Sequence, residues 1–403
     1  MSTYVRVLAA IGTTSLLVAC GSSEGDPDDL AAPNDPAIGG GGVPGSSVPS
    51  GPDPYLDART EDYATAYRNA KLALVAEAPD MVEIQKLATA VDKKANYEQM
   101  IDALIADTKR FAPQVLKFWR DTMKTGQQGA VQMNQNDLDT APVLAAMIVM
   151  QDRPYGDLFT AKTGTCPTFD AVTSVFTPAE CTNMAPVVAG VLTNPAVLEQ
   201  YDSNMAFRRI RFVQETFACS KFPAERSSEG KPMGAGVYNN PWSFESISGK
   251  KVNPTARVDF QDTSAVICAN CHGTMNHQAP LFANFNRTGV YNAQIQVRVP
   301  IPGTPVAKLD DWLPAGEKTA WRLGKDANDL AEFGAHMAAD DDVNRCIVTR
   351  TWNWAMSRGD VVDDVSPVPK TISDPLLADF KAGGFKVKAL ISKVFKAPDF
   401  VKF

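Results

Sequence analysis

The stretch Cys268-Ala269-Asn270-Cys271-His272 follows the pattern C-x-x-C-H, which is the attachment site of a c-type haem. Two thiols three positions apart can reach both vinyl groups of a haem and form thioether bonds with them. The histidine that follows directly can then bind the iron as its proximal ligand. We therefore expect Cys268 and Cys271 to hold one haem and His272 to ligate its iron, and the sequence contains no second C-x-x-C-H.

Two other interpretations of this motif stay open. The two cysteines could form a redox-active disulfide, or they could bind zinc together with His272 and His277. Zinc sites normally use four ligands in two well-spaced pairs, and no second pair of cysteines or histidines follows in the sequence. The chain has only seven cysteines and three histidines. A chance match to C-x-x-C-H is therefore rare, and haem is the favoured cofactor.

The second axial ligand of the iron must come from a separate segment, because it binds the opposite side of the porphyrin. Met275 and His277 lie so close to His272 that they are expected to stay on its side. His336 or Met337, much further along the chain, is the predicted distal ligand, with His336 the first choice and Met356 a further candidate. The alternatives are a surface or capping histidine and a methionine of the core. A methionine ligand would give the higher reduction potential.

The N-terminus resembles a bacterial lipoprotein signal. Residues 1–19 combine an arginine near the start with two apolar runs, and they are too short for a transmembrane span. The segment ends in LVACG at residues 17–21, which is similar to the lipobox. This similarity implies that Cys20 becomes the lipidated first residue of the mature protein. A plain secretory signal with an incidental cysteine is the alternative.

Residues 20–54 are expected to form a disordered tether behind the lipid. They are rich in Gly, Pro, Ser, Asp and Ala, and this composition cannot bury enough apolar surface to offset the entropy of the chain. The lipid would hold the protein at the cell envelope without spanning the membrane. Because Gly21 is not Asp, the resemblance to enterobacterial sorting signals implies the outer membrane more than the inner one.

The rest of the sequence predicts a mainly α fold with little β structure. We expect a helical domain at 55–222 and a mostly helical c-type haem domain at 223–403. Residues 56–125 hold long runs rich in Ala, Leu and Lys, with Pro79 and Pro113 as the expected helix starts. The first domain is thus predicted from its helical runs, and the second from the haem motif.

Further elements are predicted along the chain. An apolar helix is expected at 142–151, and residues 294–306 alternate in the way of a short strand pair. One helix should run from the acidic residues at 340–342 to Gly359, and another should carry the apolar residues between 387 and 395. The opposite side of that last helix carries Lys386, Lys388, Lys393 and Lys396. This basic side could dock an acidic redox partner, although a solvated helix face is the favoured interpretation.

Charge limits the classes of partner. The formal net charge of −7 argues against nucleic acid and against an anionic membrane surface as the main partner. The partners we expect are therefore a redox protein and, through the lipid on Cys20, the membrane.

Four cysteines remain outside the haem motif and the lipobox. An even number in an exported protein predicts two disulfide bonds. Cys166 and Cys181 bracket a short loop, so we pair them, and this leaves Cys219 to pair with Cys346. Three pairings are possible, and the sequence does not exclude the other two.

The motif and the residues after it resemble the haem segment of the planctomycete-type cytochrome family. In that family C-x-x-C-H is followed by Asp-Pro, then by Asn-Phe-Asp and a glycine. This chain has Asn284-Phe285-Asn286 and Gly289 in the corresponding places. It departs from the family pattern in two places, with Asn-His at 276–277 instead of Asp-Pro and Asn instead of Asp at 286. The resemblance implies an exported protein with one covalent haem.

Electron transfer by an exported lipoprotein cytochrome is therefore the function that we expect, without an enzymatic reaction. The alternatives are a haem enzyme of the peroxidase type, and a haem-bearing scaffold or sensor in a surface complex. Bacterial cytochrome c peroxidases are two-haem proteins. This sequence has a single haem-attachment motif, which counts against a peroxidase of that type. No serine-hydrolase triad, Walker or zinc-protease pattern offers a competing chemistry.

Overall fold

A computed structural model of the 403-residue chain describes residues 58–125, 136–220, 222, 242, 266–313, 316–359 and 368–403, with side chains in the segment from 266 onward described after residue 270. The predicted signal peptide, the lipidation site Cys20 and the tether lie outside the described residues. Contacts group Ala58–Phe403 as one compact unit. The predicted boundary at 222–223 adjoins undescribed residues and stays a prediction.

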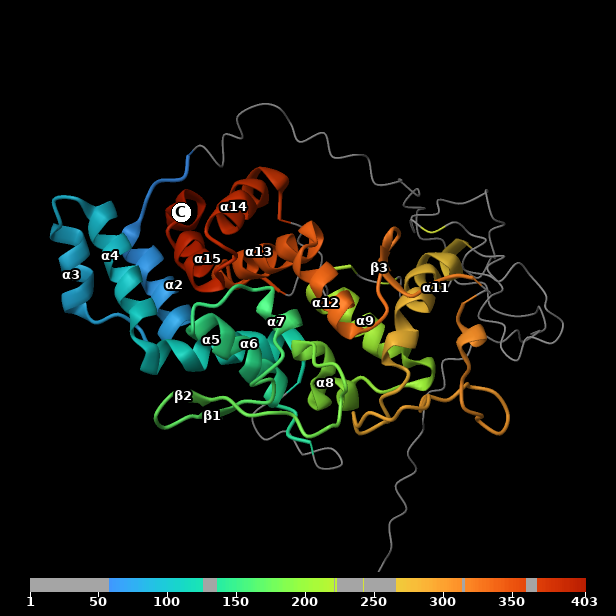
Figure 1. The fold of residues 1–403 in the computed structure, drawn as a ribbon. Coiled ribbons are helices and arrows are strands. Elements are labelled where there is room, and N and C mark those ends of the chain that lie inside the picture. Colours follow the sequence, from blue (N-terminus) through green and yellow to red (C-terminus); the bar gives the residue numbers. More distant parts are fainter. Residues whose placement is uncertain are drawn as a thin grey trace, which may run out of the picture. The chain divides into compact units, whose positions relative to one another are not determined.

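Helices make up most of the described chain (Figure 1). In the first half they are α2 (Tyr63–Val75), α3 (Met81–Thr89), α4 (Lys93–Ala106), α5 (Thr108–Met123), α6 (Thr140–Met150), α7 (Asp157–Thr160), η1 (Gly190–Thr193), α8 (Pro195–Gln200), η2 (Asn204–Ala206) and α9 (Phe207–Phe217). In the second half they are α11 (Val266–Gln278), η3 (Ala279–Phe282), η4 (Leu309–Asp311), α12 (Leu330–Ala338), α13 (Asp341–Ala355), α14 (Lys370–Ala382), α15 (Val387–Phe395) and α16 (Pro398–Val401). The predicted mainly α fold is confirmed.

The four N-terminal helices begin where the sequence supplies a capping carboxylate. Asp62, Asp80, Asp92 and Asp107 each accept hydrogen bonds from backbone N–H groups in the first turn that follows. The expected helix start at Pro113 is wrong, because this proline lies inside α5. Proline has no N–H to offer the carbonyl of Lys109 four residues earlier. The hydroxyl of Ser174 donates a hydrogen bond to that carbonyl instead, at 2.8 Å.

Strands are few and short. β1 (Thr168–Asp170) pairs antiparallel with β2 (Val175–Thr177), and β3 (Ala320–Arg322) pairs antiparallel with β4 (Lys325–Asp326). The strand pair expected at 294–306 is reduced to an isolated bridge between Arg298 and Val306. Three prolines in this segment, at 300, 302 and 305, have no N–H for a ladder, so the pairing cannot extend.

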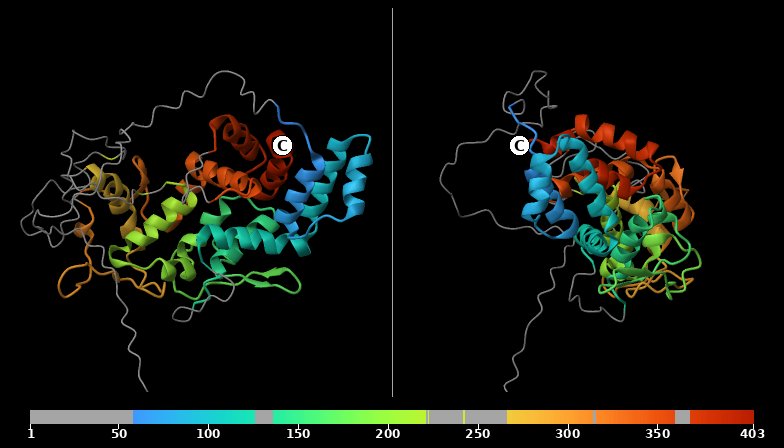
Figure 2. Two further views of the ribbon diagram at one scale, coloured as in Figure 1. Left: turned by 180° about the vertical axis from the view of Figure 1, so that it is seen from behind. Right: turned by 90° about the vertical axis from the view of Figure 1, so that its left-hand side faces the viewer.

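Helix α6 lies at the centre of the apolar core and contacts α5, α7, α8 and α15. The C-terminal helices lie beside the N-terminal ones (Figure 2). Glu61 forms a β-bridge with Lys402, and the hydroxyl of Tyr97 donates a hydrogen bond to the carbonyl of Phe395 at 2.6 Å. The N-terminal and C-terminal segments thus pack into the same core.

Both predicted disulfide bonds are confirmed. Cys166 is bonded to Cys181 next to the β1–β2 hairpin, and Cys219, just after α9, is bonded to Cys346 in α13. The second bond joins segments 127 residues apart in the sequence. It therefore fixes α9, which lies beside the motif helix α11, to the C-terminal helices.

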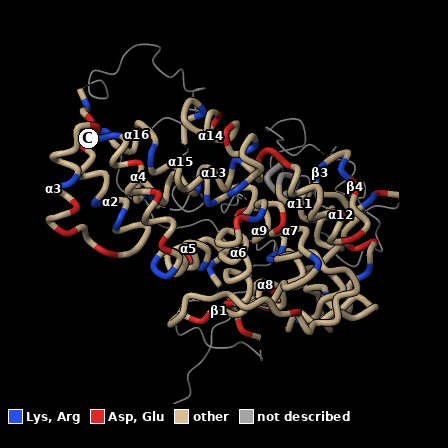
Figure 3. Tube along the Cα trace, turned by 60° about the vertical axis from the view of Figure 1, so that its left-hand side comes forward, with Lys and Arg blue, Asp and Glu red and all other residues tan. Residues whose placement is uncertain are grey.

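Of the four lysines predicted for the basic side of α15, Lys388 and Lys393 lie in the helix, and Lys386 and Lys396 directly flank it. Three of them form ion pairs: Lys386 with Asp152, Lys393 with Asp379 and Lys396 with Asp102. Figure 3 shows basic and acidic residues interspersed along the helices. Among the described residues, no helix is both long and apolar enough to cross a membrane.

Candidate haem-binding site

Helix α11 carries the whole C-x-x-C-H motif. Cys268, Cys271 and His272 occupy positions i, i+3 and i+4 of this helix. Because an α-helix turns about 100° per residue, such positions are neighbours on one side. The side chain of Cys268 lies outside the described residues, whereas Cys271 and His272 are both half-buried. The helix thus places the backbone positions of Cys268, Cys271 and His272 in one sector.

A hydrogen bond at Nδ1 orients the imidazole ring of His272. Nδ1 lies 3.2 Å from Oδ1 of Asn276, one turn further along the helix, and Asn276 is fully buried. An amide oxygen can only accept, so this contact places the ring proton on Nδ1 and the lone pair on Nε2. Phe207 of α9 packs edge-on against the imidazole, with ring centroids 5.2 Å apart. Burial lowers the pKa of His272, and the hydrogen bond with Asn276 acts in the opposite direction. Burial thus favours the neutral ring that binds metals.

His277 lies on a different side of α11, five positions beyond His272. Its Nδ1–H donates to the carbonyl of Gly273 at 2.6 Å, and its ring stacks on Trp242 with centroids 4.3 Å apart. Its Nε2 is buried, makes no hydrogen bond with a described residue and lies 3.6 Å from Oε2 of Glu317. Burial lowers the pKa of His277. The structure therefore does not bring His272 and His277 together.

The C-terminal end of α11 is fixed by Gln278, which is fully buried. Its amide oxygen accepts a hydrogen bond from Nε2 of Gln214 in α9, at 2.9 Å. Its own Nε2 donates to the carbonyl of Trp321 in β3, at 2.7 Å. The indole of Trp321 donates in turn to Asp340, the capping residue of α13. One side chain thus connects the motif helix with α9 and β3.

Arg209 fixes the segment that follows α11. It is fully buried, and its guanidinium donates to the carbonyl oxygens of Leu198, Phe282, Phe285 and Asn286 and to a carboxylate oxygen of Asp202. Desolvation lowers the pKa of Arg209 to about 10, and Asp202 partly offsets this. Arg209 therefore remains a cation at neutral pH. The sequence offered only the weak signal of its place before the motif.

The Asn-Phe-Asn…Gly stretch has a structural role in this chain. Oδ1 of Asn286 accepts three hydrogen bonds, from the N–H and hydroxyl of Thr288 and from the N–H of Val290. Gly289 has a φ of 73°, and a Cβ there would lie 2.9 Å from Cα of Pro195. Asn at 286 supplies the oxygen that an Asp would supply, so this departure from the family pattern preserves the turn.

The two predicted distal ligands lie on α12. Met337 is fully buried in the core, and His336 is partly buried, with its Nε2 2.9 Å from the carbonyl of Asp326. To bind iron through Nε2, His336 would have to give up that hydrogen bond. Helices α11 and α12 both contact β3. The assignment of either residue as an iron ligand stays a prediction.

Where side chains are described, no three His, Cys, Asp or Glu residues gather in a group that could hold a metal ion. Cys268 lies outside that search. No family model matches the chain, and no curated protein and no solved structure matches it either. The resemblance to the planctomycete-type cytochromes thus rests on the sequence features described above.

Proposed function

We propose that this protein transfers electrons through one c-type haem attached to Cys268 and Cys271, with His272 as the proximal ligand of the iron. The observation that carries the proposal is the placement of all three residues on one side of α11, with Asn276 orienting the imidazole. When bound, the haem supplies an iron that accepts and releases one electron. The orientation of the His272 ring by Asn276 supports this assignment.

The residues around the motif would orient the ligand. Asn276 holds the proton of His272 on Nδ1, and such partners of ligating histidines fix the ring and raise its basicity. Phe207 restricts rotation of the same ring. Gln278 and Arg209 fix the two ends of the segment 278–286 to the rest of the core. The motif helix is thus held by rigid elements, which favours a site that changes little between two charge states.

We further propose that the protein is an exported lipoprotein anchored through Cys20, on the outer membrane rather than the inner one. Disulfide bonds form and persist outside the cytoplasm, so the two bonds support export. The partner would be a redox protein.

The haem is tested by attachment. Denatured protein should retain the haem on a gel, and Cys271→Ala or His272→Ala should yield little holoprotein. The double variant Cys166→Ala/Cys181→Ala removes two cysteines that form a disulfide elsewhere and should keep its haem. Full haem incorporation in both motif variants would disprove the assignment. Carbon monoxide added to the reduced protein separates the two haem functions, since a spectral change would indicate an open iron position and favour the enzyme.

A further inference from the structure

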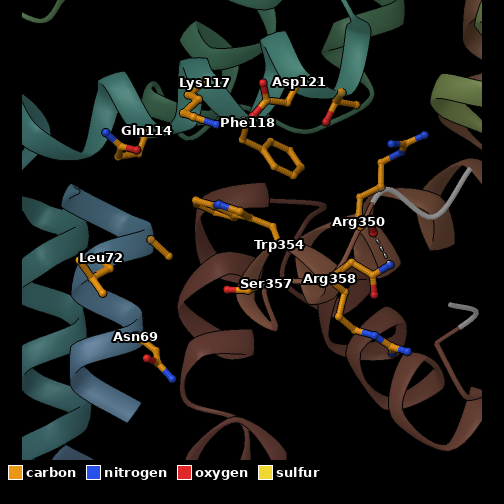
Figure 4. Close-up of a pocket in the computed structure, with 14 residues that line it drawn as sticks. Asn69, Leu72, Gln114, Lys117, Phe118, Asp121, Arg350, Trp354, Ser357 and Arg358 are labelled. Atoms are coloured by element: carbon orange, nitrogen blue, oxygen red, sulfur yellow. Dashed lines mark hydrogen bonds and ion pairs between the residues drawn. The ribbon is translucent and has the colours of Figure 1, made fainter. Parts of the chain in front are cut away.

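A hollow of about 580 Å³ lies between α2, α5 and the C-terminal end of α13, away from the haem motif (Figure 4). Sites for small molecules are concave, largely apolar and roughly 300–1,000 Å³ in volume, with a few polar groups that set orientation. The volume of this hollow falls within that range. Its lining residues form an apolar part and a polar part.

The apolar part is built on two aromatic rings. Phe118 of α5 and Trp354 of α13 lie with their ring centroids 5.2 Å apart, and Leu72 of α2 faces the same space with 41% of its surface exposed. Phe395 supports Trp354 from behind, with centroids 5.7 Å apart. Aromatic rings offer a flat apolar surface on which another ring can pack. This wall therefore suits a planar ring.

The polar part consists of side chains that bond to no described residue. The indole N–H of Trp354 and the side chains of Asn69, Gln114, Ser357 and Arg358 all line the hollow, and none of them has a hydrogen bond or ion pair within the described ranges. Donors predominate among these groups. A ligand with acceptor atoms could satisfy several of them at once.

The charge of the lining is positive in a protein of net charge −7. Among the described residues that line the hollow, Lys117, Arg350 and Arg358 contribute cations, and Asp121 is the one carboxylate. Lys117 pairs with Asp121 at 2.6 Å, but both side chains are about two-thirds exposed, so this pair is weak. Arg358 is exposed and forms no ion pair with a described residue, so within the described chain its guanidinium can bind an anionic ligand group.

At the rim of the hollow, a serine occupies a backbone conformation that usually requires glycine. Ser357 follows the C-cap of α13 with a φ of 52°, in the left-handed region where helices usually end on glycine. A residue with a Cβ is less stable there than glycine. The strained residue places a hydroxyl in the lining of the hollow, and it sets the direction in which the chain leaves toward Arg358.

We propose that this hollow binds a small organic anion with a planar apolar ring. The ring lies against Trp354 and Phe118, and its carboxylate, sulfonate or phosphate group pairs with Arg358. The proposal is independent of the haem, since none of these residues belongs to α11 or to α9 and β3, the two elements that Gln278 connects to it.

Equilibrium dialysis of the purified full chain against two probes tests the proposal. Anilinonaphthalene sulfonate carries the ring system and an anionic group, and phenylnaphthylamine carries the same rings without the sulfonate. The sulfonate probe should bind one saturable site. Arg358→Gln, an exposed substitution, should weaken that binding about tenfold, as expected for the loss of one charge-assisted hydrogen bond. It should leave the neutral probe unaffected.

Arg287→Gln is the matched control, because Arg287 is also exposed, makes no hydrogen bond or ion pair with a described side chain, and lies outside the hollow. It should change the binding of neither probe, whereas Trp354→Leu should weaken both. The proposal fails if no saturable site exists, if both arginine variants weaken the sulfonate probe equally, or if Arg358→Gln weakens both probes to the same extent.

Discussion

Two regions of this protein are stabilised by different forces. Helix α6 buries every residue from Ala141 to Val149, all of them apolar. At the end of α11, by contrast, the three fully buried residues Asn276, His277 and Gln278 are polar and bond to particular neighbours. Apolar contacts are non-directional and tolerate side chains of similar volume. A buried polar group destabilises the fold unless its partner is in place. The region of the haem motif therefore depends on individual side chains.

The disulfide Cys219–Cys346 links the chain just after α9 to α13, and its removal should have the largest effect. The double variant Cys219→Ala/Cys346→Ala should lose about 4–5 kcal/mol of unfolding free energy in the chain-entropy model, because the closed loop is long. The matched variant Cys166→Ala/Cys181→Ala opens a loop with a separation of 15 residues and should lose about 3 kcal/mol. Urea denaturation measures both losses, and a larger loss for the short loop would contradict the prediction.

Arg209 is the strongest single test of the polar region. Arg209→Met leaves four carbonyl oxygens and one carboxylate without their buried donor and should cost about 3–5 kcal/mol of unfolding free energy. Arg208→Met changes the exposed neighbouring arginine and should cost less than about 0.5 kcal/mol. Equal losses in the two variants, measured by urea denaturation, would show that the buried contacts contribute little.

Substitution by methionine compares the two regions directly. Gln278→Met keeps the size of the side chain but leaves Gln214 and the carbonyl of Trp321 without partners, at a cost of about 2 kcal/mol. Leu144→Met in α6 replaces one buried apolar side chain by another and should cost less than about 1.5 kcal/mol. Thermal or urea unfolding of both variants provides the comparison. A larger loss of unfolding free energy in Leu144→Met than in Gln278→Met would contradict the view that the polar region depends more on individual side chains.

The sequence could predict the parts of this fold that follow from local chemistry. Long Ala- and Leu-rich runs predicted the N-terminal helices, and the spacing of four cysteines predicted both disulfides. It could not predict that Ser174 would satisfy Lys109, because this bond joins segments 65 residues apart, and Pro113 was therefore misplaced as a helix start.

The candidate site likewise has one part that the sequence could predict and other parts that depend on contacts between distant segments. The motif is visible in the sequence because its three residues lie within five positions, and α11 places them on one side. The contacts of Arg209 are not visible, since it bonds to backbone carbonyls, which every residue type carries. The hollow beside Trp354 was also missed, because α2, α5 and α13 come from distant parts of the chain.

The stability of the polar region should also depend on pH. Burial holds the pKa of His277 below its usual value of 6.5, so the unfolded chain binds a proton more readily than the folded protein. Unfolding free energy should therefore fall as the pH drops below 6.5 toward the lower folded pKa, and it should be unaffected above this window. Glu317, 3.6 Å away, limits the loss because it favours the charged ring. His277→Gln should show a smaller loss than the wild type in urea unfolding across this range. An equal loss in both proteins would assign the effect to other groups.

The smallest effect that we predict concerns Asn276 and the haem. A hydrogen bond from Nδ1 of a ligating histidine makes the ring a better donor to the iron and favours the oxidised state. Asn276→Leu removes the acceptor and should therefore raise the reduction potential, by the worth of one hydrogen bond, about 1 kcal/mol or roughly 40 mV for one electron. Asn344→Leu makes the same change at a buried asparagine in α13 and should leave the potential unchanged. Haem content is measured in both variants first. Absence of haem in the wild type would refute the proposed function, whereas equal potentials in haem-loaded variants would refute only the role of Asn276. A shift confined to Asn276→Leu would show that a single polar contact in this region acts on the iron through His272.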